Sequence, residues 1–169
     1  FIDCTFGEGG HSAAILEKNG PKGIVLGIDF EIRNPKHEIR NRLILVNDNF
    51  ANLKEIVGKT NFGKADGILI DLGMSSWHLE ESGRGFSFQK QEPLDMRYSS
   101  ENQLTAEKIV NFWSVLEIEK ILTSFGEEKF AKEIAREIIN SRQMGPIQNT
   151  FQLVAFIKKA VPGWYRRQK

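Results

Sequence analysis

The chain has 169 residues, a formal net charge of +1, 40% hydrophobic and 27% charged residues, and one cysteine, Cys4. These values fit one folded domain with a modest insertion and exclude a disordered chain, a disulfide framework and a metal site of spaced Cys and His ligands. No apolar run approaches the roughly 20 residues of a membrane helix, and we expect a cytoplasmic protein with neither a metal nor a membrane partner.

Four short apolar runs are typical of buried parallel strands. Each is nearly continuous in Ile, Val and Leu, as expected for a sheet that is covered on both faces. The runs are FIDCT at residues 1–5, GIVLGID at 23–29, RLILVND at 42–48 and GILIDLG at 67–73.

Helices are predicted in the connections between these runs. One spans residues 11–23 and is ended by an Asn-Gly-Pro sequence, and another spans 49–59 with Asn49 or Asn52 at its start. The connection at 31–42 should hold a third crossover helix, although a proline interrupts its weak apolar pattern. This alternation predicts a doubly wound α/β sheet.

The second part of the chain is predicted to be helical. Apolar residues at spacings of three and four predict helix throughout 105–143. A last helix is predicted at 150–161, after a Gly-Pro break and with Thr150 as its N-cap. The predicted organisation is an α/β domain at residues 1–103 and a helical domain at 104–169.

Positive charge is concentrated near the end of the chain. Residues 120–169 hold ten basic and four acidic residues, a local net charge of +6, so the preceding residues are net acidic. A solvated helical face and a polyanion-binding surface both fit this distribution. Because Phe1 is not a start methionine and reads as part of a strand already under way, we expect a partial chain.

A glycine-rich loop follows the first predicted strand. DCTFGEGGHS, residues 3–12, reads as a strand end, a loop and a first helical turn, which is a typical place for a nucleotide-like cofactor. A dinucleotide fingerprint requires a third glycine where Ser12 stands, and the loop carries an acid, Glu8. Its glycines let the backbone approach a ligand closely: Gly7, Gly9 and Gly10.

Each predicted strand ends in an aspartate. A pyrophosphate would meet these like charges, each contact costing on the order of 4 kcal/mol at ~4 Å and an effective dielectric near 20. A sulfonium and an ammonium group fit better, which favours S-adenosylmethionine. Asp29 suits two ribose hydroxyls, as an acid also does in NAD enzymes. The alternative is that these aspartates form turns or N-caps and that His11 only caps a helix. The four aspartates are Asp3, Asp29, Asp48 and Asp71.

Three motifs carry a resemblance to a known family. The longest is DGILIDLGMSSWHLEESGRGFSFQKQEPLDMR at residues 66–97, with DCTFGEGGHS before it and FGEEKFAKEIAREI after it. With these motifs in this order, the chain resembles the MraW (RsmH) methyltransferases. The similarity covers essentially the whole chain. It implies a Rossmann-like class I methyltransferase sheet, incomplete here, with an inserted α-helical domain. It also implies a bacterial enzyme that uses S-adenosylmethionine to methylate the exocyclic N4 of a cytidine in 16S ribosomal RNA of the small subunit; a homodimer stays open.

The resemblance implies a set of cofactor contacts spread along the chain. Many family members have glutamine at the last of these positions, where this chain has histidine. The implied contacts are Gly9, Gly10, His11, Asp29, Phe50, Asp71 and His78.

Methylation of cytosine N4 needs hydrogen-bond acceptors, because its lone pair is delocalised into the ring and the amine is a poor nucleophile. The turn after the fourth predicted strand supplies candidates. We expect Asp71 to contact the cofactor, and a main-chain carbonyl, Ser75 or Ser76 to orient N4. No metal is required, because a sulfonium is a good leaving group.

The target base must leave its stack to reach the methyl group. Arg84, Phe86 and Phe88, with Trp77 nearby, are candidates for holding it, although either phenylalanine could belong to the core. Asp95 and Arg97 are candidates for reading the cytosine edge or for bracing the loop. The basic helical domain with Trp164-Tyr165-Arg166-Arg167 is interpreted as a surface for the RNA backbone.

Two other functions remain as alternatives to an rRNA methyltransferase. A non-catalytic RNA-binding module would keep the fold without the chemistry. An NAD-dependent oxidoreductase would use the same loop, but Ser12 and the acidic character of the loop argue against it.

Overall fold

The computed structural model describes residues 1–32 and 41–167. Contacts divide the chain into two compact units, Phe1–Met74 and Ser75–Lys169, which we call the sheet unit and the helical unit. Residues 75–103 group with the helices that follow them. The domain boundary after residue 103 therefore stays a prediction from the sequence and differs from the division between the compact units.

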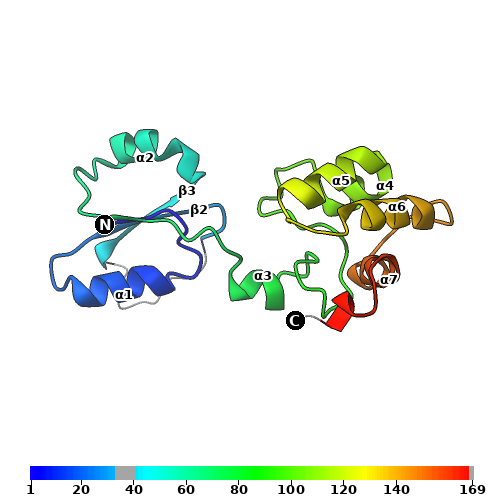
Figure 1. Ribbon diagram of the computed structural model, residues 1–169. Coiled ribbons are helices and arrows are strands. Elements are labelled where there is room, and N and C mark those ends of the chain that lie inside the picture. The colour runs from blue at the N-terminus through cyan, green and yellow to red at the C-terminus, as the bar shows by residue number, and fades with distance from the viewer. Residues whose placement is uncertain (33–40, 168–169) are drawn as a thin grey trace. The chain divides into compact units, whose positions relative to one another are not determined.

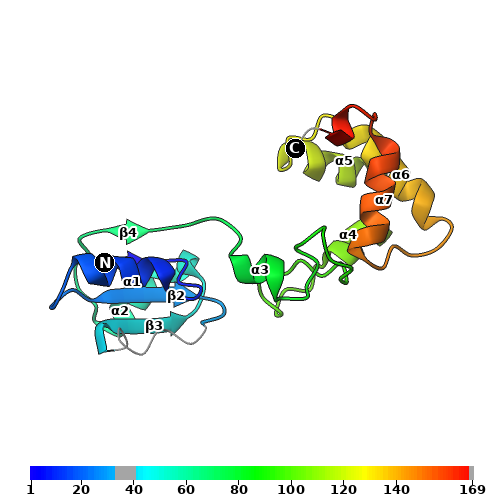
Figure 2. The ribbon, with the colours of Figure 1, turned by 90° about the horizontal axis from the view of Figure 1, so that it is seen from below.

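The sheet unit contains a parallel sheet with the strand order β3-β2-β1-β4. β4 forms one edge of the sheet and β3 the other, as Figure 2 shows. All four predicted strands are confirmed, with narrower bounds: β1 (Ile2–Asp3), β2 (Val25–Asp29), β3 (Leu43–Asn47) and β4 (Ile68–Leu69).

Helices α1 (Gly10–Lys18) and α2 (Leu53–Thr60) lie on opposite faces of this sheet (Figure 1). The 3-10 helix η2 (Phe50–Asn52) precedes α2 and begins at Asn49, whose side chain accepts a hydrogen bond from the Ala51 N–H at 2.8 Å. The predicted crossover helix falls largely on residues 33–40, which lie outside the described part of the chain. The arrangement confirms the predicted α/β class.

The order of the sheet reverses between β1 and β4, which are neighbours although β4 is last in sequence. The segments that follow these two strands meet, because the Asp71 N–H donates to Thr5 Oγ1 at 2.9 Å. Such a switch point, at the carboxyl edge of a parallel sheet, is where open α/β sheets bind ligands. The glycine loop and the turn after β4 therefore share one location.

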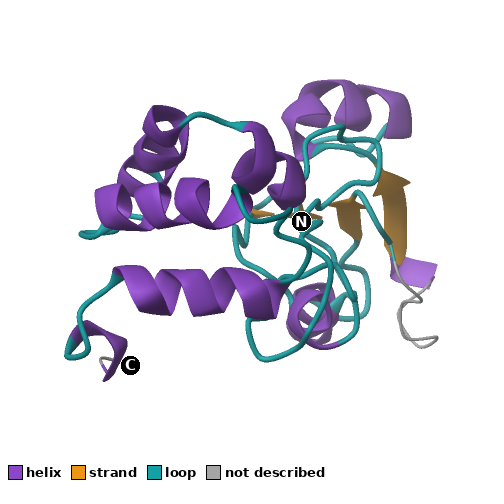
Figure 3. Cartoon of the chain, turned by 90° about the vertical axis from the view of Figure 1, so that its right-hand side faces the viewer, coloured by secondary structure: helices purple, strands orange, loops and turns teal. Residues whose placement is uncertain are grey.

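The described part of the helical unit contains no strand longer than an isolated bridge, and loops connect its helices (Figure 3). None of the helices in the described residues is long and apolar enough to cross a membrane. The helices are α3 (Ser76–Glu80), α4 (Ala106–Phe112), α5 (Val115–Ser124), α6 (Ala131–Arg142), α7 (Thr150–Ala160) and the 3-10 helix η3 (Tyr165–Arg167).

The prediction of helix throughout 105–143 was wrong, because two breaks divide this segment into α4, α5 and α6. At the first break Ser114 and Glu117 form a capping box that starts α5. At the second, Glu127 has a left-handed φ of 49°, which ends helical continuity. Local capping therefore prevails over a continuous apolar period.

The N-cap of α7 was also predicted wrongly. The side chain of Asn149 accepts from the Gln152 N–H at 3.0 Å, so Asn149 is the cap and Thr150 the first helical residue. The buried Thr150 hydroxyl instead accepts from the Glu92 N–H at 3.1 Å and donates to the Lys90 carbonyl. Thr150 thus ties α7 to the loop that precedes α4.

Helix α6 lies at the centre of the helical core. Its Ile134, Ala135 and Ile138 are at most 3% exposed, and they join buried residues of α4, α5 and the loops. A separate cluster forms the core of the sheet unit. The aromatic chromophores are divided unequally, since all three tryptophans and both tyrosines lie in the helical unit: Trp77, Trp113, Trp164, Tyr98 and Tyr165.

Candidate functional site

The glycine loop between β1 and α1 is a close-packed stretch of backbone. Gly9 has a φ of 81°, and a Cβ there would lie 2.6 Å from Cζ of Phe6. The Phe6 ring is 3% exposed and also lies against Gly27. A side chain at Gly9 would both strain the backbone and displace this ring. At Gly9 the loop thus offers backbone rather than a side chain to a ligand.

Helix α1 begins directly from this loop without a side-chain cap. Gly9 is the N-cap residue, and no side chain accepts a hydrogen bond from the first turn. The first N–H groups of a helix have no intrahelical acceptor and attract negatively charged groups. The alternative role of His11 as a cap finds no support, because its ring contacts Asp71.

Asp29, at the end of β2, holds the loop in place. Its Oδ2 accepts from the Gly7 N–H at 2.7 Å and its Oδ1 from the Glu31 N–H at 3.2 Å. An ionised carboxylate has about four acceptor positions, so two remain for a ligand. Asp29 is only half-buried, which leaves it accessible. The geometry is compatible with the predicted contact to ribose hydroxyls.

His11 and Asp71 are brought together at the switch point, although 60 residues separate them. His11 Nε2 lies 3.3 Å from Asp71 Oδ2, and both side chains are about 60% exposed. Such an exposed pair contributes little stability. Because both side chains are exposed, their polar groups are accessible to a ligand. Phe50, the other predicted contact in this unit, begins η2 and is 38% exposed.

The remaining two strand-end aspartates serve the fold. Asp3 is completely buried and accepts from the Ser12 hydroxyl at 2.7 Å. Asp48 accepts from the Asn52 side chain and the Asn49 N–H, and these hydrogen bonds hold its pKa below the ordinary value. The alternative reading as turn residues therefore describes these two. Ser12 is explained too, since it binds the buried carboxylate.

Ser75, in the turn after β4, caps the short helix α3. Its Oγ accepts from the His78 N–H at 3.4 Å and lies 2.7 Å from Nδ1 of the same histidine. Ser76 is exposed and forms no side-chain hydrogen bond within the described residues. The two predicted catalytic serines therefore differ, because only Ser75 is committed to the fold.

An aromatic cluster surrounds His78 in the helical unit. The imidazole packs edge-on against Trp77, Phe86 and Tyr98, with ring centroids 4.9–5.4 Å apart. The Arg84 guanidinium lies 5.6 Å from the Trp77 ring centroid, within cation–π range. One group is thus formed by five residues, and only part of it was predicted from the sequence. The five are Trp77, His78, Arg84, Phe86 and Tyr98.

The two predicted stacking phenylalanines differ in their surroundings. Phe86 is 8% exposed and belongs to the aromatic cluster, where it packs against His78 and Tyr98. Phe88 is 70% exposed. Core placement therefore describes Phe86, whereas the geometry of Phe88 leaves it accessible to an unstacked base.

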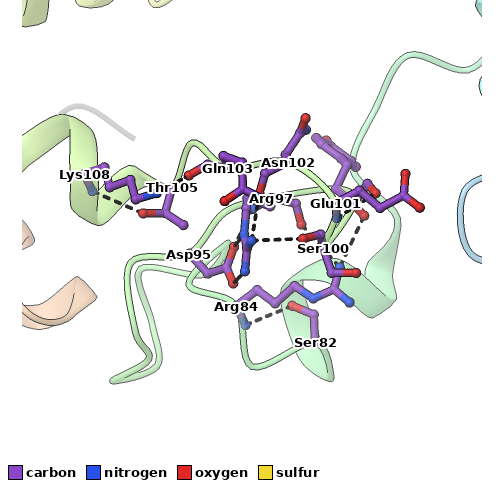
Figure 4. Close-up of polar contacts among 12 residues, drawn as sticks. Ser82, Arg84, Asp95, Arg97, Ser100, Glu101, Asn102, Gln103, Thr105 and Lys108 are labelled. Carbon is purple, nitrogen blue, oxygen red and sulfur yellow. Dashed lines mark hydrogen bonds and ion pairs between the residues drawn. The ribbon is translucent and has the colours of Figure 1, made fainter.

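Asp95 and Arg97 bind each other in a two-pronged ion pair, with Nε–Oδ1 at 2.6 Å and Nη2–Oδ2 at 2.8 Å (Figure 4). Arg97 Nη1 also donates to the Ser100 and Asn102 carbonyls. The Arg97 hydrogen bond holds the pKa of Asp95 below its ordinary value. Of the two roles considered for this pair, bracing the loop is the one that these contacts describe; reading the base edge stays a prediction.

Arg84 joins the same braced loop. Its Nη1 donates to the Arg97 and Tyr98 carbonyls at 3.2 and 3.3 Å, and its carbonyl accepts from the Met96 N–H. Met96 has a left-handed φ of 56°, which is costly for a side chain of this size. The two arginines therefore stabilise a strained turn beneath the aromatic cluster.

Three further residues shape these sites and were not predicted from the sequence. Thr5 accepts from the backbone of Asp71, and Glu92 accepts from the Gly85 N–H at 2.9 Å. Tyr98 joins the aromatic cluster, and burial raises its pKa. Only Tyr98 could have been predicted, because it is an aromatic residue directly after the PLDMR motif.

Among the described residues no group of acids, histidines and cysteine is placed to hold a metal ion.

Comparison with known proteins identifies relatives over nearly the whole chain. The chain is 43% identical to "Ribosomal RNA small subunit methyltransferase H" of Clostridium botulinum over 99% of its length and 56% of that protein. Proteins of the same name from Dehalococcoides mccartyi and Symbiobacterium thermophilum are 43% and 39% identical, again over 99% of this chain but 49% and 55% of theirs. The chain thus spans about half the length of the curated relatives it matches.

The family model described as the MraW methylase family matches residues 1–169. This match agrees with the motifs on which the resemblance was based and with the parallel α/β sheet. It leaves the interpretation as an NAD-dependent oxidoreductase without support. The chain belongs to the MraW methylase family.

Proposed function

We propose that this chain is part of a methyltransferase that acts on the exocyclic N4 of a cytidine in 16S ribosomal RNA, with S-adenosylmethionine as the methyl donor. The observation that carries this proposal is the sheet-unit site, where an uncapped helix N-terminus, Asp29 and Asp71 surround the glycine loop. Family membership supports methyl transfer, and the names of the relatives support small-subunit rRNA as the substrate.

The groups of the site fit S-adenosylmethionine. The N–H groups of Gly10 and His11, in the first turn of α1, suit a carboxylate. The remaining acceptor positions of Asp29 suit ribose hydroxyls, and the acidic loop and Asp71 suit positive charge. Phe50 offers an accessible ring for the adenine, and the resemblance adds His78 as a further contact. When bound, the cofactor supplies an electrophilic methyl group.

The residues of this chain would then orient the accepting amine. Acceptors for the N4 hydrogens favour a pyramidal nitrogen with a localised lone pair. Because Ser75 is committed to the cap of α3, we assign the contact to N4 to Ser76 or to a main-chain carbonyl of the Asp71–Ser76 turn, and a positioning role to Ser75. Asp71 remains the residue of this turn that faces the cofactor.

The aromatic cluster and Phe88 are proposed to receive the unstacked cytosine. Stacking on an aromatic ring contributes about 1–3 kcal/mol per base. Phe88 and Tyr98 are the exposed rings of the group, at 70% and 45%. These rings and their loop would be held in position by Phe86, Arg84 and the Asp95–Arg97 pair.

The proposed cellular location of the protein is the cytoplasm, where ribosomal RNA is found.

The cofactor part of the proposal is tested by calorimetric titration of the chain with S-adenosylmethionine. Asp29→Asn keeps the side-chain shape but removes acceptors, and should weaken binding about ten- to hundred-fold. Asp66→Asn, a change of equal charge in the loop before β4, should leave the affinity unchanged. Equal affinities of the unchanged chain and Asp29→Asn would contradict the assigned site.

Turnover decides between the enzyme and the non-catalytic RNA-binding alternative. Transfer of a labelled methyl group to a 16S rRNA fragment, located at cytidine N4 by nucleoside analysis, is expected. Ser76→Ala should lower the rate if its hydroxyl accepts from N4, and should not if the carbonyl does so. Cofactor binding without any transfer would favour the non-catalytic alternative.

A further inference from the structure

The outer face of α6 is divided into a basic half and an acidic half. At about 100° per residue, Lys132, Arg136 and Gln143 fall within one narrow arc opposite the buried Ile134 and Ile138. All three arc residues are exposed. The acidic residues of the helix lie beside this arc rather than in it. The arc therefore presents two cations about one helical turn apart, followed by an amide.

The cations of this arc have no partner within the described residues. No ion pair or hydrogen bond involves the side chain of Lys132 or Arg136 there, nor that of Lys129, just before the helix. Of the two acids of the helix, Glu133 is nearer the arc, about 60° beyond its edge, and its side chain forms no ion pair within the described residues. Glu137 is bound by Lys159 at 2.7 Å and by Ser141. The charges of the arc are thus not neutralised by the fold.

Two arginines of the helical unit are committed to its structure. Arg142 donates to the Val110 and Trp113 carbonyls at 3.0 and 2.8 Å, which secures the end of α4. Arg166 donates to the Val161 carbonyl at 3.1 Å. Tyr165 donates to Glu128 and packs against Phe130. Tyr165 and Arg166 of the terminal aromatic-basic segment therefore serve the fold.

These observations point to one class of partner. Unneutralised cations in a row along a rigid helix suit a phosphate backbone, and a neighbouring amide suits ribose hydroxyls. A membrane surface is disfavoured, because helices that lie on bilayers insert an apolar face, and the apolar face of α6 is buried in the core. RNA is the polyanion that the proposed function already supplies.

We infer that Lys132 and Arg136, with Lys129, bind the phosphate backbone of the RNA substrate, and that Arg166 is not the main RNA contact. This inference rests on the proposed function for the identity of the polyanion. It assigns the contact with the RNA backbone to one face of one helix.

The test is fluorescence anisotropy with a labelled RNA hairpin whose loop contains unpaired cytidines, measured over a range of salt concentrations. The variant Lys132→Gln, Arg136→Gln should bind on the order of ten-fold more weakly, with its salt slope reduced by about one per removed cation. Lys54→Gln, Lys64→Gln removes equal charge from exposed positions of the sheet unit and should bind normally. Circular dichroism should show unchanged helix content in both.

Three results would overturn the inference. They are unchanged binding by the α6 variant, an equal loss in the sheet-unit control, and a larger loss in Arg166→Gln than in the α6 variant. A chain that binds no RNA at low salt would overturn it as well. Because titration with S-adenosylmethionine needs no RNA, that measurement shows separately whether the proposed cofactor site has failed.

Discussion

The sheet unit and the helical unit position their candidate functional groups by different means. In the sheet unit the backbone does the positioning, through strand ends, a left-handed glycine and N–H groups that point at Asp29. In the helical unit side chains do it, through the Asp95–Arg97 pair, the aromatic cluster and the outer face of α6. The first arrangement depends on the absence of side chains at a few positions, and the second depends on their presence.

This difference predicts where each unit is sensitive to substitution. A helical core fixed by large buried side chains loses stability when they are truncated, whereas its exposed cations can be exchanged without cost to the fold. Gly9, which lies against the Phe6 ring, leaves no room for a larger residue.

Ile138→Ala should cause the largest loss of stability. Ile138 is 3% exposed in the core around α6, and truncation of a buried isoleucine costs about 2–5 kcal/mol. Urea denaturation followed by circular dichroism measures the change in the free energy of unfolding. Asn140→Ala, on the exposed side of the same helix, is the control and should stay within about 0.5 kcal/mol. A loss below about 1 kcal/mol in Ile138→Ala would mean that α6 is not the centre of a packed core.

Gly9→Ala should damage the sheet unit through its backbone. The new Cβ would lie 2.6 Å from the Phe6 ring, at a φ of 81° that alone costs about 1–3 kcal/mol. We expect both a lower free energy of unfolding and loss of measurable S-adenosylmethionine binding in calorimetry. Gly10→Ala meets no protein atom within 4 Å and should keep the free energy of unfolding unchanged. Equal stability of the two variants would show that the fold of the loop does not depend on glycine geometry.

Ser12→Ala asks whether a side chain also contributes to the sheet unit. It removes the 2.7 Å hydrogen bond to the completely buried Asp3, and a buried acceptor that loses its donor costs about 1–3 kcal/mol. Thermal and urea denaturation measure the loss. Ser100→Ala, at an exposed position, provides the matched control. If both serines can be replaced without loss, Asp3 has found another donor.

The Asp95–Arg97 pair should give the smallest effect, visible as a dependence on pH. Because the hydrogen bond from Arg97 lowers the pKa of folded Asp95 below the unfolded value near 3.9, the pair stabilises the protein above about pH 4. That contribution disappears as the pH falls through the folded pKa. Denaturation midpoints from pH 7 to pH 2 should therefore fall less steeply in Asp95→Asn. Parallel curves would assign acid sensitivity to other carboxylates.

The sequence predicted the features that local pattern controls. Continuous apolar runs located all four strands, and their alternation with helices predicted the α/β class. What failed depends on competition between neighbours. The capping box at Ser114 interrupted a continuous apolar period, and Asn149 displaced Thr150 as the cap of α7.

Other features could not be predicted because they depend on contacts between distant segments. The hydrogen bond of Thr5 to Asp71 spans 66 residues, and that of Thr150 to Glu92 spans 58. Whether Arg142 serves the fold and Arg136 faces solvent is also decided by packing, since both are arginines of one helix. Composition therefore located a basic region, and only the structure distinguished the basic residues that pack against the fold from those that face solvent.

The unequal division of chromophores gives each unit its own spectroscopic reporter. Tryptophan and tyrosine emission arises only from the helical unit, where every such residue lies. The single thiol, Cys4, is 2% exposed inside the sheet unit. Its pKa is raised mainly by burial and to a smaller extent by the negative charge of Asp3. Cys4 should therefore react with a disulfide reagent only when the sheet unit opens. Emission and thiol labelling, recorded on one unmodified sample, would show whether the two units unfold together or one after the other.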